Sequence, residues 1–405
     1  MTAPAQPQNP TVLPKGFSFS ALAAGIKVSG RLDLALVESA PGTTAAALFT
    51  QNLVVAAPVE VGRGHLAKTR GRARAVIVNS GNANCATGDA GVRACKQVCK
   101  KVAETLTIRP EEVFPSSTGI IGVPLPTEKI LANLPQLAAS RESTPAALDG
   151  FTQAIMTTDT RQKVASAQFS AQGSVVTLLG VAKGSGMIHP QLATMLVYLF
   201  TDVAATPAEL KQVLREACDQ SFNCISVDGD TSTNDTVLLL ASGHSAIRLK
   251  DARIRKKFAK ALAEVCRSLA EQVVADGEGV KHVIHLFIEQ AKSRQEALQV
   301  ARTIAHSLLV KTAWAGADPN WGRILAAVGR SGPALNPKRV DIYIGKQMVC
   351  KGGAGCEFDE AMAHADLAQP KCDVRVRLGR GNSRVAFITS DLTAEYVRIN
   401  ADYST

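Results

Sequence analysis

The sequence predicts a mixed α/β or α+β protein with substantial antiparallel strand pairing. Short apolar runs of strand length alternate along the chain with longer segments whose apolar residues recur at helical spacing. Clusters of Gly, Pro, Asn and Ser separate many of these segments, as turns do. Of the 405 residues, 46% are hydrophobic and 20% are charged, which provides enough apolar surface for a core and excludes global disorder.

The individual elements follow from this patterning in chain order. Residues 1–15 resemble a loose arm, and residues 17–78 alternate short apolar runs with Gly and Pro breaks, as strands and turns do. Strands are expected at 75–78, 175–181, 237–240, 283–288, 374–378 and 384–388. Apolar residues at helical spacing predict helices at 91–105, 127–165, 207–223, 255–274 and 295–310. The turn sequence at 379–383 predicts that the last two strands pair as a β-hairpin.

Charge and cysteine usage limit the environment and the partners. With 45 Lys and Arg against 35 Asp and Glu, the net charge of +10 favours anionic partners, which include nucleic acid, membranes and small carboxylates. The longest apolar run, 195–200, is too short to cross a bilayer, and residues 1–10 lack an export signal. Nine cysteines without a regular framework indicate reduced thiols, so a cytoplasmic protein is expected.

Several active-site signatures are absent from the sequence. It contains no Gly-x-Gly-x-x-Gly after a strand, no P-loop, no Gly-x-Ser-x-Gly and no His-Glu-x-x-His. Cys95 and Cys99 share a helix face, but no clustered histidine completes a zinc site, so no metal is expected. The basic segment 250–260 precedes and continues onto the polar face of a predicted helix. A solvated face is favoured there over a phosphate-binding surface.

The segment 181–200 carries the most informative chemistry. A strand is expected to end near Lys183, the glycines that follow it free the backbone, and Pro190 stiffens the chain. Thr194 then stands at the start of a hydrophobic run. From chemistry alone this threonine could be a nucleophile, a helix N-cap or the first residue of a strand, and the cap or strand is favoured.

The same segment carries a family resemblance. Residues 183–188, Pro190 and residues 193–196 match the most specific motif of the ornithine acetyltransferase family, the bifunctional glutamate N-acetyltransferases of arginine biosynthesis. Further matches to that family lie in order at 14–17, 79–84, 117–122, 154–160, 276–279, 318–324 and 397–403. The resemblance therefore covers nearly the whole chain.

The resemblance implies a precursor that cleaves itself between Ala193 and Thr194, which gives fragments 1–193 and 194–405. The Thr194 hydroxyl would attack the preceding carbonyl, and water would open the resulting ester. Thr194 would then carry a free α-amine with an ordinary pKa of about 7.7–8.0, close enough to neutral to take the proton of its own hydroxyl. The two fragments are expected to stay intertwined and to assemble as a heterotetramer with two copies of each.

The implied reaction is ping-pong acetyl transfer. Thr194 would accept the acetyl group of N-acetylornithine and release ornithine. Glutamate would then take the acetyl group and leave as N-acetylglutamate. The resemblance implies that neither step needs a metal or an organic cofactor, and it leaves acetyl-CoA open as a second acetyl donor.

Further site residues follow from the same resemblance. Thr118 and Gly119 would form the oxyanion hole, since the run 115–119 is rich in hydroxyl and backbone donors. Lys183 would bind the substrate carboxylate, and Glu278 would bind the cationic side chain of ornithine. The expected polar substrate contacts are Thr157, with Thr158 as its alternative, Asn400 and Thr405.

The resemblance also implies the fold, in which β-sheets are sandwiched between helices and a smaller second α/β domain follows. The sequence departs from the family pattern at two places. Val280-Lys281-His282 stands where Ala-Thr-Lys is usual, and Gln191-Leu192 stands where Asn-Met is common. Neither change touches the nucleophile.

Two other functions stay open. A self-processing amidohydrolase or aminopeptidase would pass the acyl group to water, although the combination of Lys183, Glu278, Asn400 and Thr405 argues against it. A basic nucleic-acid-binding protein would explain the net charge but not the motif around Thr194. The expected partners are therefore small-molecule substrates, with neither nucleic acid nor a membrane.

Overall fold

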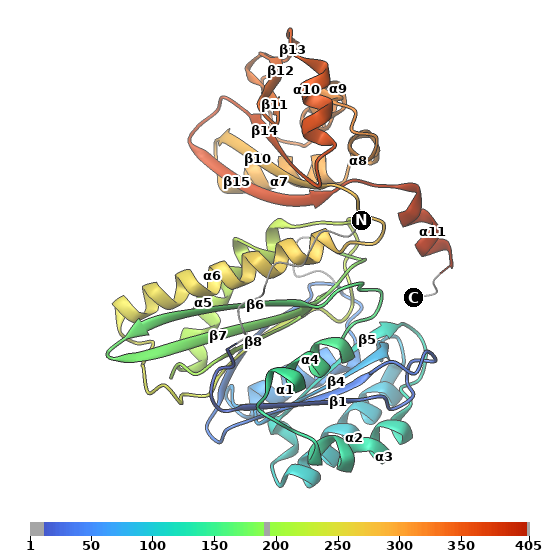
Figure 1. The fold of residues 1–405 in the computed structure, drawn as a ribbon, viewed down its shortest axis with the longest axis vertical. Helices are drawn as coiled ribbons and strands as arrows, with labels where there is room; N and C mark the ends of the chain where they lie inside the picture. Colours follow the sequence, from blue (N-terminus) through green and yellow to red (C-terminus); the bar gives the residue numbers. More distant parts are fainter. Residues whose placement is uncertain (1–11, 190–194, 403–405) are drawn as a thin grey trace.

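The computed structural model describes residues 12–189 and 195–402, which form three β-sheets with helices packed against them (Figure 1). Two sheets face each other in a main lobe, and the third forms a smaller C-terminal lobe with its own helices. The expected arrangement of sheets between helices, with a smaller second α/β unit, is confirmed. Within the described ranges, no helix is long and apolar enough to cross a membrane.

The N-terminal sheet forms one half of the main lobe. Its strands are, in spatial order, β1 (Phe17–Leu22), β2 (Leu34–Ser39), β4 (Ala75–Asn82) and β5 (Val113–Ile120). Only β4 and β5 run parallel, so their carboxyl ends lie together. Helices α2 (Gly88–Leu106) and α3 (Thr127–Ala139) cover the outer face, and α1 (Ala57–Lys68) packs beside β5.

The middle sheet forms the other half. Its order is β3 (Thr44–Phe49), β9 (Thr236–Ala241), β8 (Leu196–Thr201), β7 (Ser174–Lys183) and β6 (Lys163–Ala171). Helices α5 (Pro207–Asp219) and α6 (Ala252–Ala275) cover its outer face. Every residue of β8 and β9 is buried, because sheet or helix lies on both sides of these parallel strands. This explains their unbroken apolar sequences.

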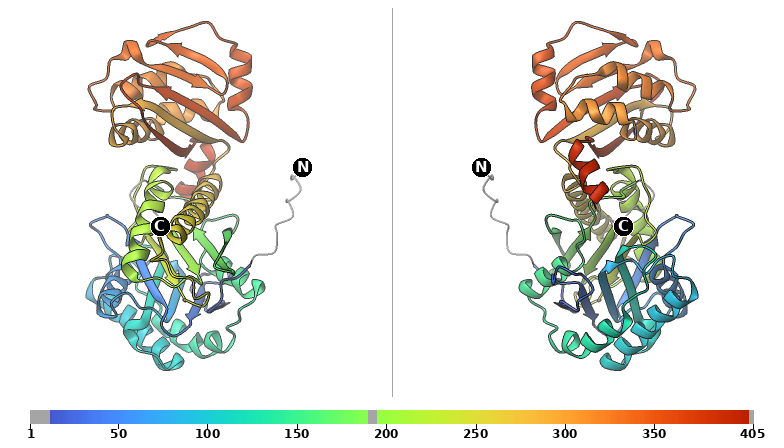
Figure 2. Two further views of the ribbon diagram at one scale, coloured as in Figure 1. Left: turned by 90° about the vertical axis from the view of Figure 1, so that its left-hand side faces the viewer. Right: turned by 90° about the vertical axis from the view of Figure 1, so that its right-hand side faces the viewer.

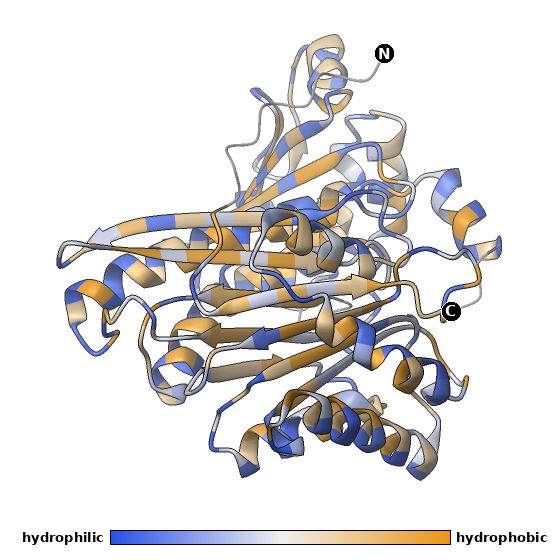
Figure 3. Cartoon of the chain, turned by 60° about the horizontal axis from the view of Figure 1, so that its bottom comes forward, coloured by the Kyte–Doolittle hydropathy of each residue, from blue (hydrophilic) through white to orange (hydrophobic). Residues whose placement is uncertain are grey.

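The two sheets enclose an aromatic core. Phe19 and Phe151 both pack edgewise against Phe200 and are tilted against each other, and Tyr198 packs edgewise against Phe151. Phe151 comes from α4 (Pro145–Ala154), which lies along the edge between the sheets. Figure 3 shows the apolar residues gathered on these inner strands, while the outer helices alternate polar and apolar faces.

The C-terminal lobe contains a six-stranded sheet. Its order is β13 (Ala354–Gly355), β12 (Gln347–Lys351), β11 (Asp341–Ile344), β14 (Lys371–Arg377), β10 (Val283–Ala291) and β15 (Ser383–Ser390). Its helices are α7 (Arg294–Ala305), α8 (Leu308–Ala315), α9 (Trp321–Gly329) and α10 (Glu360–Leu367). Helix α11 (Ala394–Asp402) then returns from β15 toward the main lobe (Figures 1 and 2). Short 3-10 turns occur at Pro110–Glu112, Phe222–Cys224 and Pro337–Arg339.

The hairpin expected around residues 379–383 is wrong. Strands β14 and β15 lie on opposite sides of β10, which pairs parallel with the first and antiparallel with the second. The connecting loop crosses the end of β10, where the N–H groups of Arg380 and Gly381 donate to the Gln290 carbonyl. Burial of Ile284, Leu286 and Ile288 in the lobe core draws β10 into the position between the other two strands.

Two expected helices are shorter than their periodicity suggested. The segment 127–165 contains α3 and α4, but Lys163 already belongs to β6. The segment 295–310 breaks at His306 and Ser307, where α7 ends and α8 begins. By contrast, the basic residues at 250–260 are exposed while Phe258 is fully buried, as expected for the polar and apolar faces of an amphipathic helix.

Candidate active site

A cavity of about 250 Å³ lies where the carboxyl ends of β4, β5 and β7 meet the turn after α6 and helix α11. The residues around it come from distant parts of the chain. Six residues that the sequence analysis selected line it together: Thr118, Gly119, Thr157, Lys183, Glu278 and Asn400. Thr158 lines it as well, so the structure does not choose between the two adjacent threonines. Ala193, Thr194 and Thr405 lie outside the described residues.

Gly119 stands at the end of β5 in a conformation that requires glycine. Its φ is +134°, and a Cβ there would lie 2.3 Å from the carbonyl carbon of Gly81 on β4. Any side chain would therefore push the two strand ends apart. The neighbouring Ser117 hydroxyl donates to Asn79 Oδ1 at 2.6 Å, which further ties β5 to β4.

Asn234 holds this part of the cavity wall in place, and the sequence analysis missed it. Its amide nitrogen donates to the Ala83 carbonyl at 2.7 Å and to the Ser117 carbonyl at 2.9 Å. One side chain from the loop before β9 thus connects both strand ends of the other sheet. A lone asparagine in a polar loop carries no sequence signal for such a bridge.

Lys183 ends β7 and reaches across to the N-terminal sheet. Its side chain is buried, and Nζ donates to Thr118 Oγ1 at 3.2 Å. Burial lowers the pKa of Lys183, while the carboxylate of Asp159 acts in the opposite direction. The cation thus lies at the cavity wall, beside the hydroxyl expected in the oxyanion hole.

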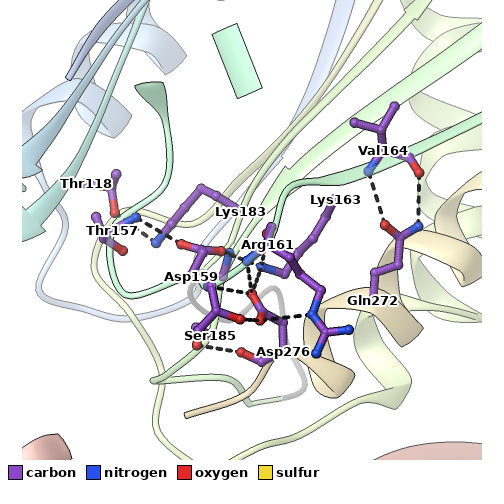
Figure 4. A network of polar contacts seen from close by, with 12 residues as sticks. Thr118, Thr157, Asp159, Arg161, Lys163, Val164, Lys183, Ser185, Gln272 and Asp276 are labelled. Carbon is purple, nitrogen blue, oxygen red and sulfur yellow. Dashed lines mark hydrogen bonds and ion pairs between the residues drawn. The ribbon is translucent and has the colours of Figure 1, made fainter. Parts of the chain in front are cut away.

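A buried ionic cluster lies directly behind Lys183 (Figure 4). The ammonium of Lys163 contacts Asp159 Oδ1 at 2.6 Å and Asp276 Oδ2 at 2.5 Å, and all three side chains are almost inaccessible. Burial alone would raise the pKa of Asp159, but Lys183 and Lys163 outweigh it and hold that pKa below its usual range. No sequence motif predicts this cluster, because Asp276 lies 113 residues from Lys163 in the chain.

The cluster also fixes the backbone around the cavity. Asp159 accepts hydrogen bonds from the N–H groups of Thr157 at 3.0 Å and Gly184 at 2.7 Å. Asp276 accepts from the Thr160 N–H at 3.1 Å, and its carbonyl accepts from the Ser185 hydroxyl at 2.6 Å. The loop at 157–160, the end of β7 and the turn after α6 are therefore held in one arrangement.

Glu278 and Asn400 form another part of the cavity wall. The Asn400 amide donates to Glu278 Oε2 at 2.9 Å, and the Glu278 N–H donates to the Ser185 carbonyl at 3.1 Å. Two of the residues that depart from the family pattern after this turn, Lys281 and His282, make their hydrogen bonds outside the cavity wall. The Lys281 N–H and the His282 ring bond to Asp391 at 3.1 and 3.0 Å, so their contacts secure the entry to β10.

Met195 is the first described residue after the expected cleavage position. Its N–H donates to Asp235 Oδ1 at 2.9 Å, and Leu196, the next residue, pairs with Lys183 between β8 and β7. Burial raises the pKa of Asp235 well above its usual value, and its Oδ2 has no hydrogen-bond partner among the described residues. The chain therefore re-enters the fold beside the lysine that lines the cavity.

The glycine-containing loop at 184–189 is anchored from the other side by Asp228. This carboxylate accepts the N–H groups of Met187 at 2.5 Å and Ile188 at 2.8 Å, with Met187 in the left-handed region at φ +58°. Burial raises the pKa of Asp228 to about 6, against the opposing effect of these hydrogen bonds. The anchor lies immediately before the segment that carries the expected cleavage position.

The described residues contain no group of three or more His, Cys, Asp or Glu side chains arranged to hold a metal ion. Cys95 and Cys99 are buried on the inner face of α2, and their mutual hydrogen bond, together with burial, raises the pKa of Cys99. Small buried side chains, as expected, account for this pair.

Comparisons with known proteins agree with the motif resemblance. The ArgJ family profile matches residues 18–405. The arginine biosynthesis bifunctional protein ArgJ of Methylococcus capsulatus is 46% identical over 397 residues, which cover 96% of this chain and 95% of the relative. That of Geobacter sulfurreducens is 44% identical over 394 residues, covering 96% and 99%. A crystal structure of the Bacillus halodurans protein of the same name is 40% identical, covers 51% of this chain and 98% of its own, and has a TM-score of 0.49.

The family profile spans nearly the entire chain, and both relatives align over almost their full length. All the motifs that carry the resemblance, except the one at 14–17, fall within the residues that the profile matches. The chain therefore belongs to the ArgJ family.

Proposed function

We propose that this chain is the acyltransferase that moves an acetyl group from N-acetylornithine to glutamate through an acetyl-Thr194 intermediate. Membership of the ArgJ family and curated relatives named as arginine biosynthesis bifunctional proteins support this activity. The observation that carries the proposal is the cavity itself, which combines the cation Lys183, the carboxylate Glu278 and the Thr118–Gly119 strand end. An amino acid with a charged side chain presents the complementary groups.

The first step is self-cleavage at Thr194. Its hydroxyl oxygen attacks the Ala193 carbonyl carbon, the peptide C–N bond breaks, and the nitrogen takes the hydroxyl proton. Water then hydrolyses the ester and leaves the Ala193 carboxylate and the free amine and hydroxyl of Thr194. The register of Leu196 opposite Lys183 supports this position, because only one residue separates Thr194 from Leu196.

The second step is acetyl transfer. The Thr194 amine takes the proton of its own hydroxyl while the oxygen attacks the acetyl carbonyl of N-acetylornithine. The resulting tetrahedral intermediate carries a negative oxygen, which Thr118 and Gly119 stabilise by hydrogen bonds. Its collapse breaks the C–N bond and releases ornithine with the proton. The neutral amine of glutamate attacks the acetyl ester in the same way, and Thr194 is regenerated.

The substrate contacts follow the charges of the cavity. Lys183 binds the α-carboxylate, and Glu278 with Asn400 binds the distal ammonium of ornithine. Thr157 and Thr405 supply further polar contacts.

The reaction needs no metal or organic cofactor. Acetyl-CoA is a second acetyl donor, whose thioester carbonyl the Thr194 hydroxyl attacks in the same way.

The cleaved protein is proposed to act in the cytoplasm as a heterotetramer of two 1–193 and two 194–405 fragments. Sheet topology supports the intertwining of the fragments. Strands β7 and β8 pair with each other although they lie on opposite sides of the cleavage position, and so do β3 and β9. Cleavage would therefore leave the middle sheet held by hydrogen bonds from both fragments.

The alternative is a self-processing amidohydrolase, in which water accepts the acyl group. To distinguish the two, purified protein is incubated with N-acetylornithine in the presence and absence of glutamate. N-acetylglutamate should form with glutamate, and acetate release without glutamate should be slow. Release of acetate at the same rate without glutamate would overturn the transferase proposal in favour of the hydrolase.

A further inference from the structure

The contact between Lys183 and Thr118 has a direction that limits what the threonine hydroxyl can do. An ammonium group carries hydrogen-bond donors and no acceptor, so Thr118 Oγ1 must accept in the 3.2 Å contact with Lys183 Nζ. The hydroxyl then keeps its own hydrogen for another partner. Among the described residues this hydrogen has no acceptor, and Thr118 lines the cavity.

We propose that Lys183 is a positioning residue for the oxyanion hole, because its ammonium group orients the Thr118 hydroxyl to donate into the cavity. The inference rests on the proposed acyl transfer and is separate from the carboxylate contact of Lys183. An ammonium has three N–H donors, so one can hold Thr118 while another binds substrate.

The surroundings keep both groups in place. Thr118 belongs to a strand pair that the close approach of Gly119 to Gly81 fixes, and Lys183 ends the strand whose next residue, Gly184, bonds to Asp159. Both side chains are buried, at 6% and 3% exposure. The hydrogen bond therefore joins two rigid strand ends from different sheets, as a preorganised donor requires.

The direction of the hydrogen bond depends on the charge of Lys183. Burial lowers the pKa of Lys183. The carboxylates of Asp159, Asp235 and Glu278 raise this pKa, and the cation of Lys163 lowers it. Lys27 is a further cation nearby. A neutral amine has a lone pair and can accept the Thr118 hydrogen, which removes the donor from the cavity. As pH rises through the pKa of Lys183, the oxyanion hole should lose its hydroxyl donor.

The test is a double-mutant cycle with Lys183→Met, Thr118→Val and the double variant. Each protein is incubated until its intact mass shows complete cleavage, and kcat and KM are measured for transfer from N-acetylornithine to glutamate. If Lys183 acts through Thr118, each single change should lower kcat by roughly 100-fold, the scale of one oxyanion-hole donor. The double variant should be no slower than the slower single variant, because the second change has nothing left to remove.

Three results would overturn the proposal. One is an unchanged kcat in Lys183→Met with only a higher KM, which would leave the lysine as a carboxylate ligand. Another is a double variant whose losses in kcat multiply. The third applies even if the variants do not cleave: a wild-type kcat that stays constant up to pH 10.5, the ordinary lysine value and therefore above the lowered pKa of Lys183, would show that the ammonium does not matter.

Controls separate this inference from the proposed function. Lys311→Met removes another fully buried lysine, in the C-terminal lobe, and should leave kcat and KM unchanged. If the wild-type protein transfers no acetyl group to glutamate, the proposed function fails. If the wild type transfers acetyl and the cycle is additive, only the role of Lys183 fails.

Discussion

At the scale of single residues, the proposed chemistry depends on the hydroxyl of Thr194 and on the backbone conformation of Gly119. Thr194→Ala removes the only nucleophile that the protein supplies in the proposed mechanism, and it should abolish both self-cleavage and acetyl transfer. Intact mass under denaturing conditions and the coupled assay measure the two losses. Thr194→Ser retains a hydroxyl and should still cleave. Two fragments and activity from the alanine variant would eliminate the N-terminal nucleophile.

Gly119 tests the oxyanion hole in the same way. Gly119→Ala places a Cβ 2.3 Å from the Gly81 carbonyl carbon and should lower kcat by roughly 100-fold, since the donor would move. Gly122→Ala is the matched control. Gly122 also has a positive φ, +83°, but open space around it, so its cost is only about 1–2 kcal/mol of stability with kcat retained. Equal kcat in both variants would argue against a catalytic role for this turn.

At the scale of elements, the buried cluster of Asp159, Lys163 and Asp276 connects a loop, a strand end and the C-terminus of α6. Asp276→Asn leaves the buried Lys163 cation with one carboxylate instead of two. The free energy of unfolding should fall by about 3–5 kcal/mol, the cost of breaking a buried ion pair. Denaturant unfolding measures this change.

A control on the same helix separates burial from charge. Glu264→Gln removes the exposed partner of Lys260, 3.9 Å away, and should change the unfolding free energy by less than about 0.5 kcal/mol. Similar effects of the two substitutions would mean that the cluster is no more important than a surface pair. A further consequence is a higher KM in Asp276→Asn, because the Glu278 turn follows directly.

At the scale of the whole molecule, the proposed cleavage position lies between two paired strands of the middle sheet, so both fragments would contribute strands to the main lobe. Fragments 1–193 and 194–405 should elute together in size-exclusion chromatography and separate only in denaturant, because β7–β8 and β3–β9 pair across the cut. Fragment 1–193 expressed alone should be insoluble, since β7 would lose its neighbour β8 and expose the core between the sheets. A soluble, folded 1–193 fragment would contradict this interdependence.

Helix α11 makes the C-terminal lobe part of the same site. It follows β15 of that lobe, yet Tyr396 and Asn400 line the cavity of the main lobe (Figure 2). Asn400 reaches Glu278, which is 122 residues away in the sequence. The wall of the cavity therefore depends on the docking of helix α11 against the main lobe.

The sequence by itself determined the local elements and the family. Buried runs such as 237–240 and the amphipathic pattern of 255–274 predicted β9 and α6, because periodicity reports the environment of each side chain. The family motifs also single out Thr118, Lys183, Glu278 and Asn400, and these residues line one cavity.

Only the tertiary structure decided which elements and charges meet. The order β14–β10–β15 replaced the hairpin that the local turn suggested, because strand pairing is a contact between distant segments. Lys163 pairs with Asp276, which is 113 residues away in the sequence, and Lys183 donates to Thr118, which is 65 residues away. Residue patterns record whether a side chain is buried but not which partner it meets. The ionic cluster and the orientation of the Thr118 hydroxyl therefore emerge only when the sheets pack.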